Sequence, residues 1–262
     1  MFLYFAPNAP HGPATPARRH RAEFSGKMVR RDLAFNEFDV SDKPSPMQAV
    51  PPLTATEIAA LDREERDRLR VLLAADEAID DILRALERAG RLDNCAVFVL
   101  SDNGYQLGQH RLASQKGAPY DDSVRVPMLA WGAGFRERRD DRLVANVDIA
   151  PTVAGLAGVK FRKADGIDLL GGESRDFVPL QMPGNQQIPP GTGLRSPELV
   201  YMEYDTGERE FYDRRVDPLE LANLLPPGSS FAGPSPEGLP PVAYLNARTR
   251  ELTRCVRRRC RT

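Results

Sequence analysis

The chain has 262 residues, of which 41% are hydrophobic and 28% charged, and its 36 Lys and Arg nearly balance its 37 Asp and Glu. This composition fits one large globular domain or a medium and a small one, and it excludes a mainly disordered chain. The net charge of −1 argues against nucleic acid or an anionic membrane as a partner, and no apolar run is long enough to span a bilayer.

The first predicted element is a short buried strand over Phe2 to Ala6, because the run is apolar and aromatic and ends at Pro7. It has neither the basic start nor the apolar length of a signal peptide. A buried-strand pattern that begins at residue 2 leads us to expect a chain that starts inside a domain. The stretch from Pro7 to Pro52 is rich in proline and charge, which predicts a long irregular segment.

A long helix is predicted from Thr54 to Gly90, with Thr56 as its N-cap and Gly90 closing it. Its apolar side chains recur every three or four residues at Leu69, Leu72, Leu73, Ile79, Leu83 and Leu86. The run Cys95 to Leu100 follows, continuously apolar as in central parallel strands. A long helix that leads into such a strand favours an α/β architecture.

Further along, Pro127 to Trp131 predicts a strand, and Asp148 to Leu156 predicts a short helix capped by Asp148 and closed by Gly158. Residues 181–197 hold seven Pro or Gly, which predicts a linker or surface loop. A hairpin is predicted within Leu199 to Tyr212, around Thr206-Gly207. The end of the chain predicts a helix that becomes strongly basic, with seven Arg in 248–261, either a solvated end or a contact for an anionic partner.

The chemistry concentrates after the strand at 95–100, where Ser101, Asp102, Asn103 and Gly104 follow at once. Loops that bind ligands gather at the carboxyl ends of strands in open α/β sheets. Asp102 and Asn103 offer two hard oxygen donors, which suit Ca²⁺ or Mg²⁺. The same four residues are also compatible with an Asn-Gly turn in which the aspartate accepts a hydrogen bond, a common arrangement.

Three more side chains complete a candidate anion pocket. Lys116 can hold a tetrahedral oxyanion as a point charge, and His110 lies six residues before it. His11 lies between prolines that restrict the backbone, and an imidazole can donate a hydrogen bond or a proton. The alternative for each is an ordinary loop residue, and His20 has only that interpretation. We expect the strands at 2–6 and 95–100 to be parallel neighbours or near-neighbours, so that their carboxyl ends open on the same edge and His11 lies close to Asp102, Asn103 and Lys116.

Together these motifs resemble the type I sulfatases. The resemblance covers nearly the whole chain, and the motifs come in family order: Phe-Leu-Tyr-Phe-Ala-Pro-Asn-Ala-Pro-His at 2–11, Asp76-Glu77, Ser-Asp-Asn-Gly-Tyr-Gln-Leu-Gly-Gln-His-Arg-Leu at 101–112, Lys-Gly-Ala-Pro-Tyr at 116–120, Arg-Val-Pro at 125–127, Val-Asp-Ile-Ala-Pro-Thr at 147–152, Asp165-Gly166, Glu-Phe-Tyr-Asp at 210–213 and Asp-Pro-Leu-Glu-Leu-Ala-Asn-Leu at 217–224.

The resemblance implies an α/β fold with an alkaline-phosphatase-like sheet flanked by helices, over 1–180, and a small C-terminal α+β subdomain over 181–262. It implies hydrolysis of sulfate esters with a divalent cation, Ca²⁺ or else Mg²⁺. Asp102 and Asn103 would be metal ligands, Lys116 and His11 catalytic groups on the sulfate and the leaving alcohol, and His110 a substrate-binding residue.

The sequence also departs from the family pattern at positions that the family needs for catalysis. The family's nucleophile derives from the first residue of Cys-x-Pro-x-Arg or Ser-x-Pro-x-Arg, and no Cys or Ser here stands in that context. The family's Asp-Asp pair, which completes the cation site, is also absent. We therefore expect the C-terminal portion of a sulfatase, inactive as an isolated chain and carrying an open sheet edge.

Two alternatives stay open at this point. One is a non-catalytic remnant or anion-binding fragment, which the missing nucleophile favours. The other is a phosphodiesterase or phosphonate hydrolase of the same superfamily, which Asn103 after Asp102 disfavours. Cys255 and Cys260 form either a disulfide, which would suit an exported protein, or two free thiols. Family members are often secreted or periplasmic, and neither the compartment nor the oligomeric state follows from the sequence.

Overall fold

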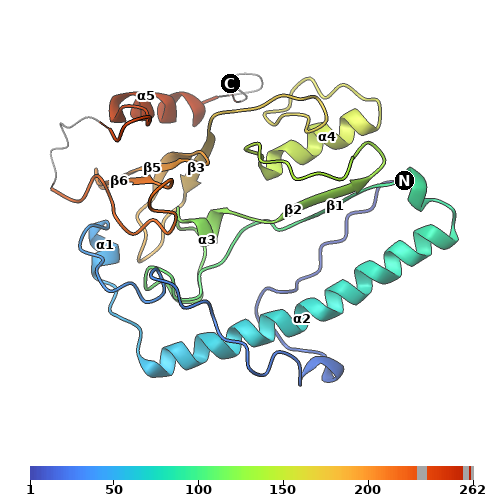
Figure 1. Cartoon of the computed structure of the whole chain (residues 1–262), viewed down its shortest axis with the longest axis horizontal. Coiled ribbons are helices and arrows are strands. Elements are labelled where there is room, and N and C mark those ends of the chain that lie inside the picture. Colours follow the sequence, from blue (N-terminus) through green and yellow to red (C-terminus); the bar gives the residue numbers. More distant parts are fainter. Residues whose placement is uncertain (229–234, 256–259, 261–262) are drawn as a thin grey trace.

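The computed structural model describes residues 1–228, 235–255 and 260, and Figure 1 shows its arrangement. Its α-helices are α1 (Ser45–Gln48), α2 (Ala55–Arg88), α3 (Asp121–Val124), α4 (Ile149–Leu156) and α5 (Val242–Leu252), with single 3₁₀ turns at Arg18–His20, Leu92–Asn94 and Asn146–Asp148. Its strands are β1 (Ala96–Leu100), β2 (Met128–Gly132), β3 (Val178–Met182), β4 (Gly191–Arg195), β5 (Leu199–Tyr204) and β6 (Arg209–Asp213).

The long helix α2 confirms the predicted helix and corrects its N-cap. Thr54, not Thr56, caps it: the Thr54 side chain accepts the Glu57 N–H at 3.3 Å, and the Glu57 carboxylate accepts the Thr54 N–H at 2.7 Å. This reciprocal pair satisfies two N–H groups that the first turn leaves free. At the other end Gly90 has a φ of +62°, the left-handed conformation that favours glycine after a helix.

The strand at 95–100 forms as β1, but its neighbour is not the one expected. β1 pairs antiparallel with β2 in a two-stranded sheet, and not in parallel with residues 2–6. Residues 1–8 have no regular secondary structure, and the side chain of Phe2 is 75% exposed. The aromatic run satisfies the side-chain pattern of a buried strand, but the described residues provide it with no strand to pair with and no surface to cover it.

Residues 181–197 are not a linker. They form parts of β3 and β4 in a four-stranded antiparallel sheet of order β3-β4-β5-β6. The glycines that suggested a loop serve close packing instead: a Cβ at Gly193 would lie 2.1 Å from the carbonyl oxygen of Tyr201 on β5. The hairpin between β5 and β6 is confirmed, with Gly207 at a φ of +85°.

The hydrophobic core surrounds this four-stranded sheet. Residues of β5 alternate between its two faces, so that Leu199 and Tyr201 pack toward α5 while Val200 and Met202 pack toward the segment around Tyr120. The cluster around Tyr120 contains residues from both sides of position 180. The domain boundary predicted at that position stays a prediction. A smaller cluster joins Val29, Leu61 and Leu107.

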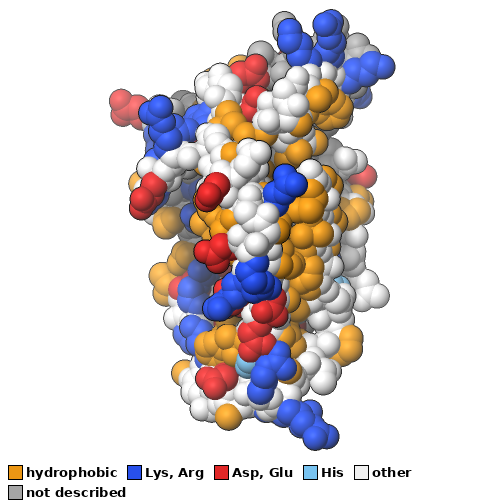
Figure 2. Space-filling model, turned by 90° about the vertical axis from the view of Figure 1, so that its right-hand side faces the viewer, with side chains coloured by type: hydrophobic (Ala, Val, Ile, Leu, Met, Phe, Trp, Pro, Cys, Tyr) orange, Lys and Arg blue, Asp and Glu red, His pale blue; other side chains and the backbone are white. Residues whose placement is uncertain are grey.

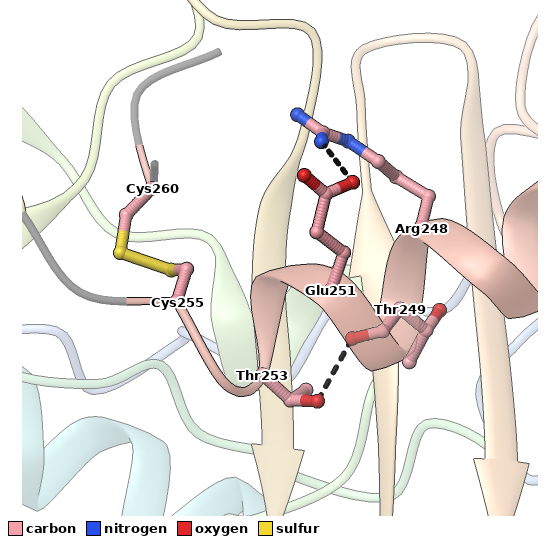
Figure 3. Close-up of a disulfide and its surroundings, with 6 residues drawn as sticks. All are labelled: Arg248, Thr249, Glu251, Thr253, Cys255 and Cys260. Atoms are coloured by element: carbon pink, nitrogen blue, oxygen red, sulfur yellow. Dashed lines mark hydrogen bonds and ion pairs between the residues drawn. A yellow bond between two sulfur atoms is a disulfide. The ribbon is translucent and has the colours of Figure 1, made fainter. Parts of the chain in front are cut away.

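The cysteines at the end of the chain form a disulfide, which settles the alternative left open by the sequence. Cys255 and Cys260 are bonded just beyond α5 (Figure 3). The last turn of α5 carries the Arg248–Glu251 ion pair at 2.6 Å and a bond from the Thr253 hydroxyl to the Thr249 carbonyl. Four of the seven arginines of the basic tail, at 257–259 and 261, lie outside the described residues. Within the described part, no helix combines the length and apolarity that a membrane span requires.

Candidate anion and cation site

The loop after β1 is a tight turn that presents Asp102 and Asn103. The Ser101 hydroxyl donates to the Asn103 carbonyl, and the Asp102 carboxylate accepts the Asn103 N–H, both at 2.9 Å. Gly104 lies so close to α3 that a Cβ there would be 2.2 Å from the Asp122 carbonyl oxygen. Asp102 therefore does act as a turn acceptor, while its side chain stays exposed.

Lys116 reaches this loop across thirteen residues. Its Nζ donates to the Asn103 Oδ1 at 3.0 Å, and the Lys116 side chain is otherwise exposed. The structure thus brings together one predicted anion-binding residue and one predicted metal ligand. The lysine ammonium can hold an anion, and the hard oxygen donors beside it are suited to a divalent metal ion.

Ser123 of α3 ties the two loops together. Its carbonyl accepts the Gly104 N–H at 2.9 Å, and its hydroxyl accepts the N–H groups of Gly117 at 2.9 Å and Ala118 at 3.3 Å. This buried serine therefore positions Asn103 and Lys116 relative to one another. Sequence reasoning missed it, since a serine in a four-residue helix has no pattern that marks it.

A third segment clamps the same loop from the start of α4. The Asn146 side-chain amide donates to the carbonyls of Ser101 at 2.9 Å and Asp102 at 3.3 Å. The backbone next to Asn146 is fixed by the buried Asp148, whose carboxylate accepts the N–H groups of Ala145 and Ile167 and pairs with Arg175. Asp148 occupies the predicted N-cap position of α4, but its side chain stabilises this loop junction rather than capping the helix.

His110 lies in the interior. Its ring is 2% exposed, its Nδ1 is 2.6 Å from the Glu37 carboxylate, and its centroid is 4.0 Å from that of Tyr120. Burial lowers the pKa of His110 to about 3 and raises the pKa of Glu37 to about 7. These contacts join His110 to the core, and the substrate-binding role expected for it stays a prediction.

A buried lysine that the sequence did not point to completes this interior group. Lys43 is fully buried, and its Nζ donates to the carbonyls of Glu220 and Leu221, both at 2.9 Å. It also lies 3.5 Å from the Glu37 carboxylate and 4.7 Å from the centre of the Tyr212 ring. Lys43 therefore ties the irregular N-terminal segment to the C-terminal part of the chain.

The ring of His11 has a different polar partner. It is exposed, and its Nδ1 is 2.9 Å from the Gly12 carbonyl oxygen, which can only accept, so Nδ1 is the donor in this contact. Within the described residues its recorded polar partner is Gly12 rather than Asp102, Asn103 or Lys116. The expected convergence rested on parallel strands at 2–6 and 95–100, and because that pairing is wrong, the catalytic role of His11 stays a prediction.

The cation site is likewise a prediction. In the part of the chain that the structure describes, three or more His, Cys, Asp and Glu nowhere gather in a way that could hold a metal ion. Asp102 and Asn103 fit Ca²⁺ by the chemistry of their oxygens, but two donors are fewer than the six to eight that Ca²⁺ takes.

The fold and the loop together define a class: a mixed α/β protein in which a lysine and hard oxygen donors meet at the carboxyl end of a strand. Comparison with known proteins gives the family. The sequence profile of the Sulfatase family matches residues 1–159, and the chain therefore belongs to the sulfatase family.

Curated relatives agree with this assignment. The chain is 34% identical over 173 residues to the human N-acetylglucosamine-6-sulfatase, which covers 65% of this chain and 31% of that one. It is 35% identical over 263 residues to the arylsulfatase of Volvox carteri, covering 81% of this chain and 39% of that one. The chain thus spans between about three tenths and two fifths of the length of these relatives.

Solved structures confirm the fold class. A putative sulfatase from Bacteroides thetaiotaomicron matches 91% of this chain and 57% of its own, with a TM-score of 0.68 at 22% identity. A protein solved in complex with its substrate D-glucosamine-2-N,6-O-disulfate matches 65% of this chain and 38% of its own, with a TM-score of 0.57 at 26% identity. The fold is that of the alkaline-phosphatase-like sulfatases.

Proposed function

We propose that this chain provides the sulfate- and cation-binding part of a sulfate ester hydrolase centre. The observation that carries the proposal is the bond from Lys116 to Asn103 at the carboxyl end of β1, where Asp102 is also exposed. Membership of the sulfatase family supports it, as do relatives whose names and bound substrate refer to sulfated sugars and aryl sulfates.

In this proposal each exposed side chain has one task. Asp102 and Asn103 hold Ca²⁺, or Mg²⁺ in its place, and the cation supplies positive charge that orients and neutralises the sulfate. Lys116 binds a sulfate oxygen through a charge-assisted hydrogen bond. His11 assists departure of the alcohol as a general acid, a contribution typically worth about 10²–10⁴-fold.

The chain contains no Cys or Ser in the motif that yields the family's nucleophile. That observation favours a second candidate function, an anion-binding protein without catalysis of its own. The phosphonate hydrolase alternative gains nothing further, since a phosphonate monoester hydrolase from Agrobacterium radiobacter, at a TM-score of 0.54 and 22% identity, shares the fold alone.

Sulfate binding tests the proposed site directly. In titration calorimetry with sodium sulfate and CaCl₂, the wild-type chain should bind sulfate, and Lys116→Ala should weaken that binding at least about tenfold, because a charge-assisted hydrogen bond is lost. Lys160→Ala, which changes an exposed lysine of another loop, is the matched control and should bind like wild type. Equal binding by all three proteins would contradict the site.

Turnover tests the missing nucleophile. The isolated chain, co-expressed with a formylglycine-generating enzyme, should give no release of nitrocatechol from nitrocatechol sulfate above buffer, because it lacks a residue that can be matured into the nucleophile. An active arylsulfatase assayed alongside shows that the conditions support turnover. Multiple turnovers by the pure chain, free of contaminating sulfatase, would show that this expectation is wrong.

A further inference from the structure

Four charged side chains meet beside α3 and are largely removed from solvent. Many charged side chains of this chain stand at the surface, as the blue and red groups in Figure 2 show for one face of the molecule. Here, by contrast, Glu220 is 1% exposed and each of the two arginines 11%. We call the four residues the α3 cluster; they are Asp121, the first residue of α3, Arg195 at the end of β4, Arg214 just after β6, and Glu220.

The two arginines bridge the two carboxylates. The Asp121 carboxylate pairs with Arg195, and its Oδ2 lies 3.0 Å from the Arg214 Nη2. The Glu220 Oε1 lies 3.3 Å from the Arg195 Nη1 and 3.0 Å from the Arg214 Nε. Each guanidinium therefore contacts both carboxylates, which suits the planar fork of N–H donors of an arginine and not the single ammonium of a lysine.

Glu220 also binds the backbone of α3. Its Oε2 accepts the Asp121 N–H at 2.9 Å, from a position 99 residues further along the chain. The side chain of Tyr120, the N-cap residue, makes no capping bond of its own. Glu220 has a φ of +59°, a costly conformation for a residue with a side chain, and such a conformation persists where the surrounding contacts fix it. The contacts with α3 and the two arginines are of that kind.

α3 depends on support from other elements. It has only four residues, and a single helical turn is unstable on its own. Its Ser123 nevertheless joins the two loops of the candidate site, because its carbonyl accepts the Gly104 N–H and its hydroxyl the Gly117 N–H. The position of Lys116 relative to Asn103 therefore depends on what holds α3 in place.

We propose that the α3 cluster is a positioning group of the sulfate site: it ties α3 to the four-stranded sheet so that Lys116 stays matched to Asn103 when sulfate binds. None of its members contacts the sulfate. Burying charges costs free energy that offsets much of their attraction, so the cluster fixes an arrangement more than it adds stability. The inference rests on the proposed function, because it assigns these residues to the same site.

Arg214→Gln breaks the cluster, and Arg215→Gln is its matched control. Arg215 is the next residue and is also ion-paired, but its bonds go to Asp213 and to the Glu237 carbonyl rather than to α3. If Arg214→Gln fails to fold, Arg214→Lys takes its place, since a lysine keeps the charge and cannot bridge both carboxylates as the guanidinium does.

Hydrogen exchange reads the position of α3 without sulfate. The reference is the Ile167 amide, which is buried and bonded to Asp148 at 2.9 Å. In Arg214→Gln the exchange of the Gly104 and Gly117 amides should accelerate at least about tenfold more than that of Ile167, because freeing α3 opens the bonds to Ser123 without unfolding the chain. In Arg215→Gln the ratio of these rates should stay as in wild type.

Sulfate affinity reads the consequence for the site. In titration calorimetry with sodium sulfate and CaCl₂, Arg214→Gln should bind about three- to tenfold more weakly than wild type, and Arg215→Gln should bind as wild type does. Introduced into Lys116→Ala, the same Arg214→Gln change should weaken binding less than about twofold, because a positioning residue acts through the residue that it positions. A merely structural role would cost the same in both backgrounds.

Three results would overturn the inference alone. These are glycine amides in Arg214→Gln that keep their wild-type ratio to Ile167, an equal change of that ratio in Arg215→Gln, and an equal loss of affinity from Arg214→Gln with and without Lys116. A wild-type chain that binds no sulfate would instead contradict the proposed function and, with it, the role of the cluster in a sulfate site.

Discussion

Glu210→Ala is expected to lower the free energy of unfolding by about 3–6 kcal/mol, since three buried hydroxyls would lose their acceptor at about 1–2 kcal/mol each. Glu210 is fully buried on β6, and its carboxylate accepts the hydroxyls of Tyr120 and Tyr212, both at 2.7 Å, and of Tyr204. Burial and this carboxylate raise the pKa of all three tyrosines well above its usual value, so each hydroxyl remains a donor.

Urea denaturation followed by circular dichroism measures this loss. Glu203→Ala is the matched control, since Glu203 on β5 is only half-buried and accepts one tyrosine hydroxyl, from Tyr201 at 2.6 Å, and the side-chain amide of Asn246. The loss of these two bonds should lower the free energy of unfolding by about 1–2 kcal/mol. Glu210→Gln should lie between the two, because its amide oxygen can still accept two of the bonds. Equal effects of Glu210→Ala and Glu203→Ala would contradict the role of Glu210 as a shared buried acceptor.

Local patterns predicted most of the regular elements. Helix α2 followed from its three- and four-residue apolar spacing, and the β5–β6 hairpin from alternation around Gly207. Strand β4 was missed because a glycine in a strand and a glycine in a loop look alike in sequence. Only the packing of β5 against Gly193 shows why that position admits no side chain.

The pairing between strands was less predictable than the positions of the helices and strands. Residues 2–6 have the composition of a buried strand, but composition does not specify a partner, and the described chain offers them none. The position of β1 was predicted correctly. Its expected parallel neighbour was wrong, because β1 pairs antiparallel with β2.

The candidate site was predictable where the residues are close in sequence. Asn103 and Lys116 share one stretch between β1 and α3, and the structure brings them into contact. The expected position of His11 depended on a distant strand pairing that was wrong, so its place in the site stays a prediction. Ser123 and Lys43 act through backbone groups, which carry no residue-specific signal, so no motif could have indicated either.

The buried pair of His110 and Glu37 leads to the second prediction, a pH dependence of stability with two opposing parts. The folded pKa of His110 is about 3, against 6.5 in the unfolded chain, so the unfolded chain binds the extra proton between these values. Its contribution to stability is therefore present above pH 6.5 and is lost as the pH falls toward 3. Glu37 has a folded pKa of about 7 against 4.5, so its contribution is present below pH 4.5 and is lost as the pH rises through 7.

Because the two effects overlap, variants are needed to separate them. His110→Asn suits the positive φ of +52° at this position, which asparagine tolerates, and Glu37→Gln keeps the size of the side chain. The stability of wild type minus that of His110→Asn should rise from pH 3.5 to 6.5, with a slope of at most about 1.4 kcal/mol per pH unit. Wild type minus Glu37→Gln should fall from pH 4.5 to 7 with the same limit. Urea denaturation measured across this pH range gives both differences in stability. If the two differences change with pH in the same direction, burial does not lower the pKa of His110 and raise the pKa of Glu37 as stated.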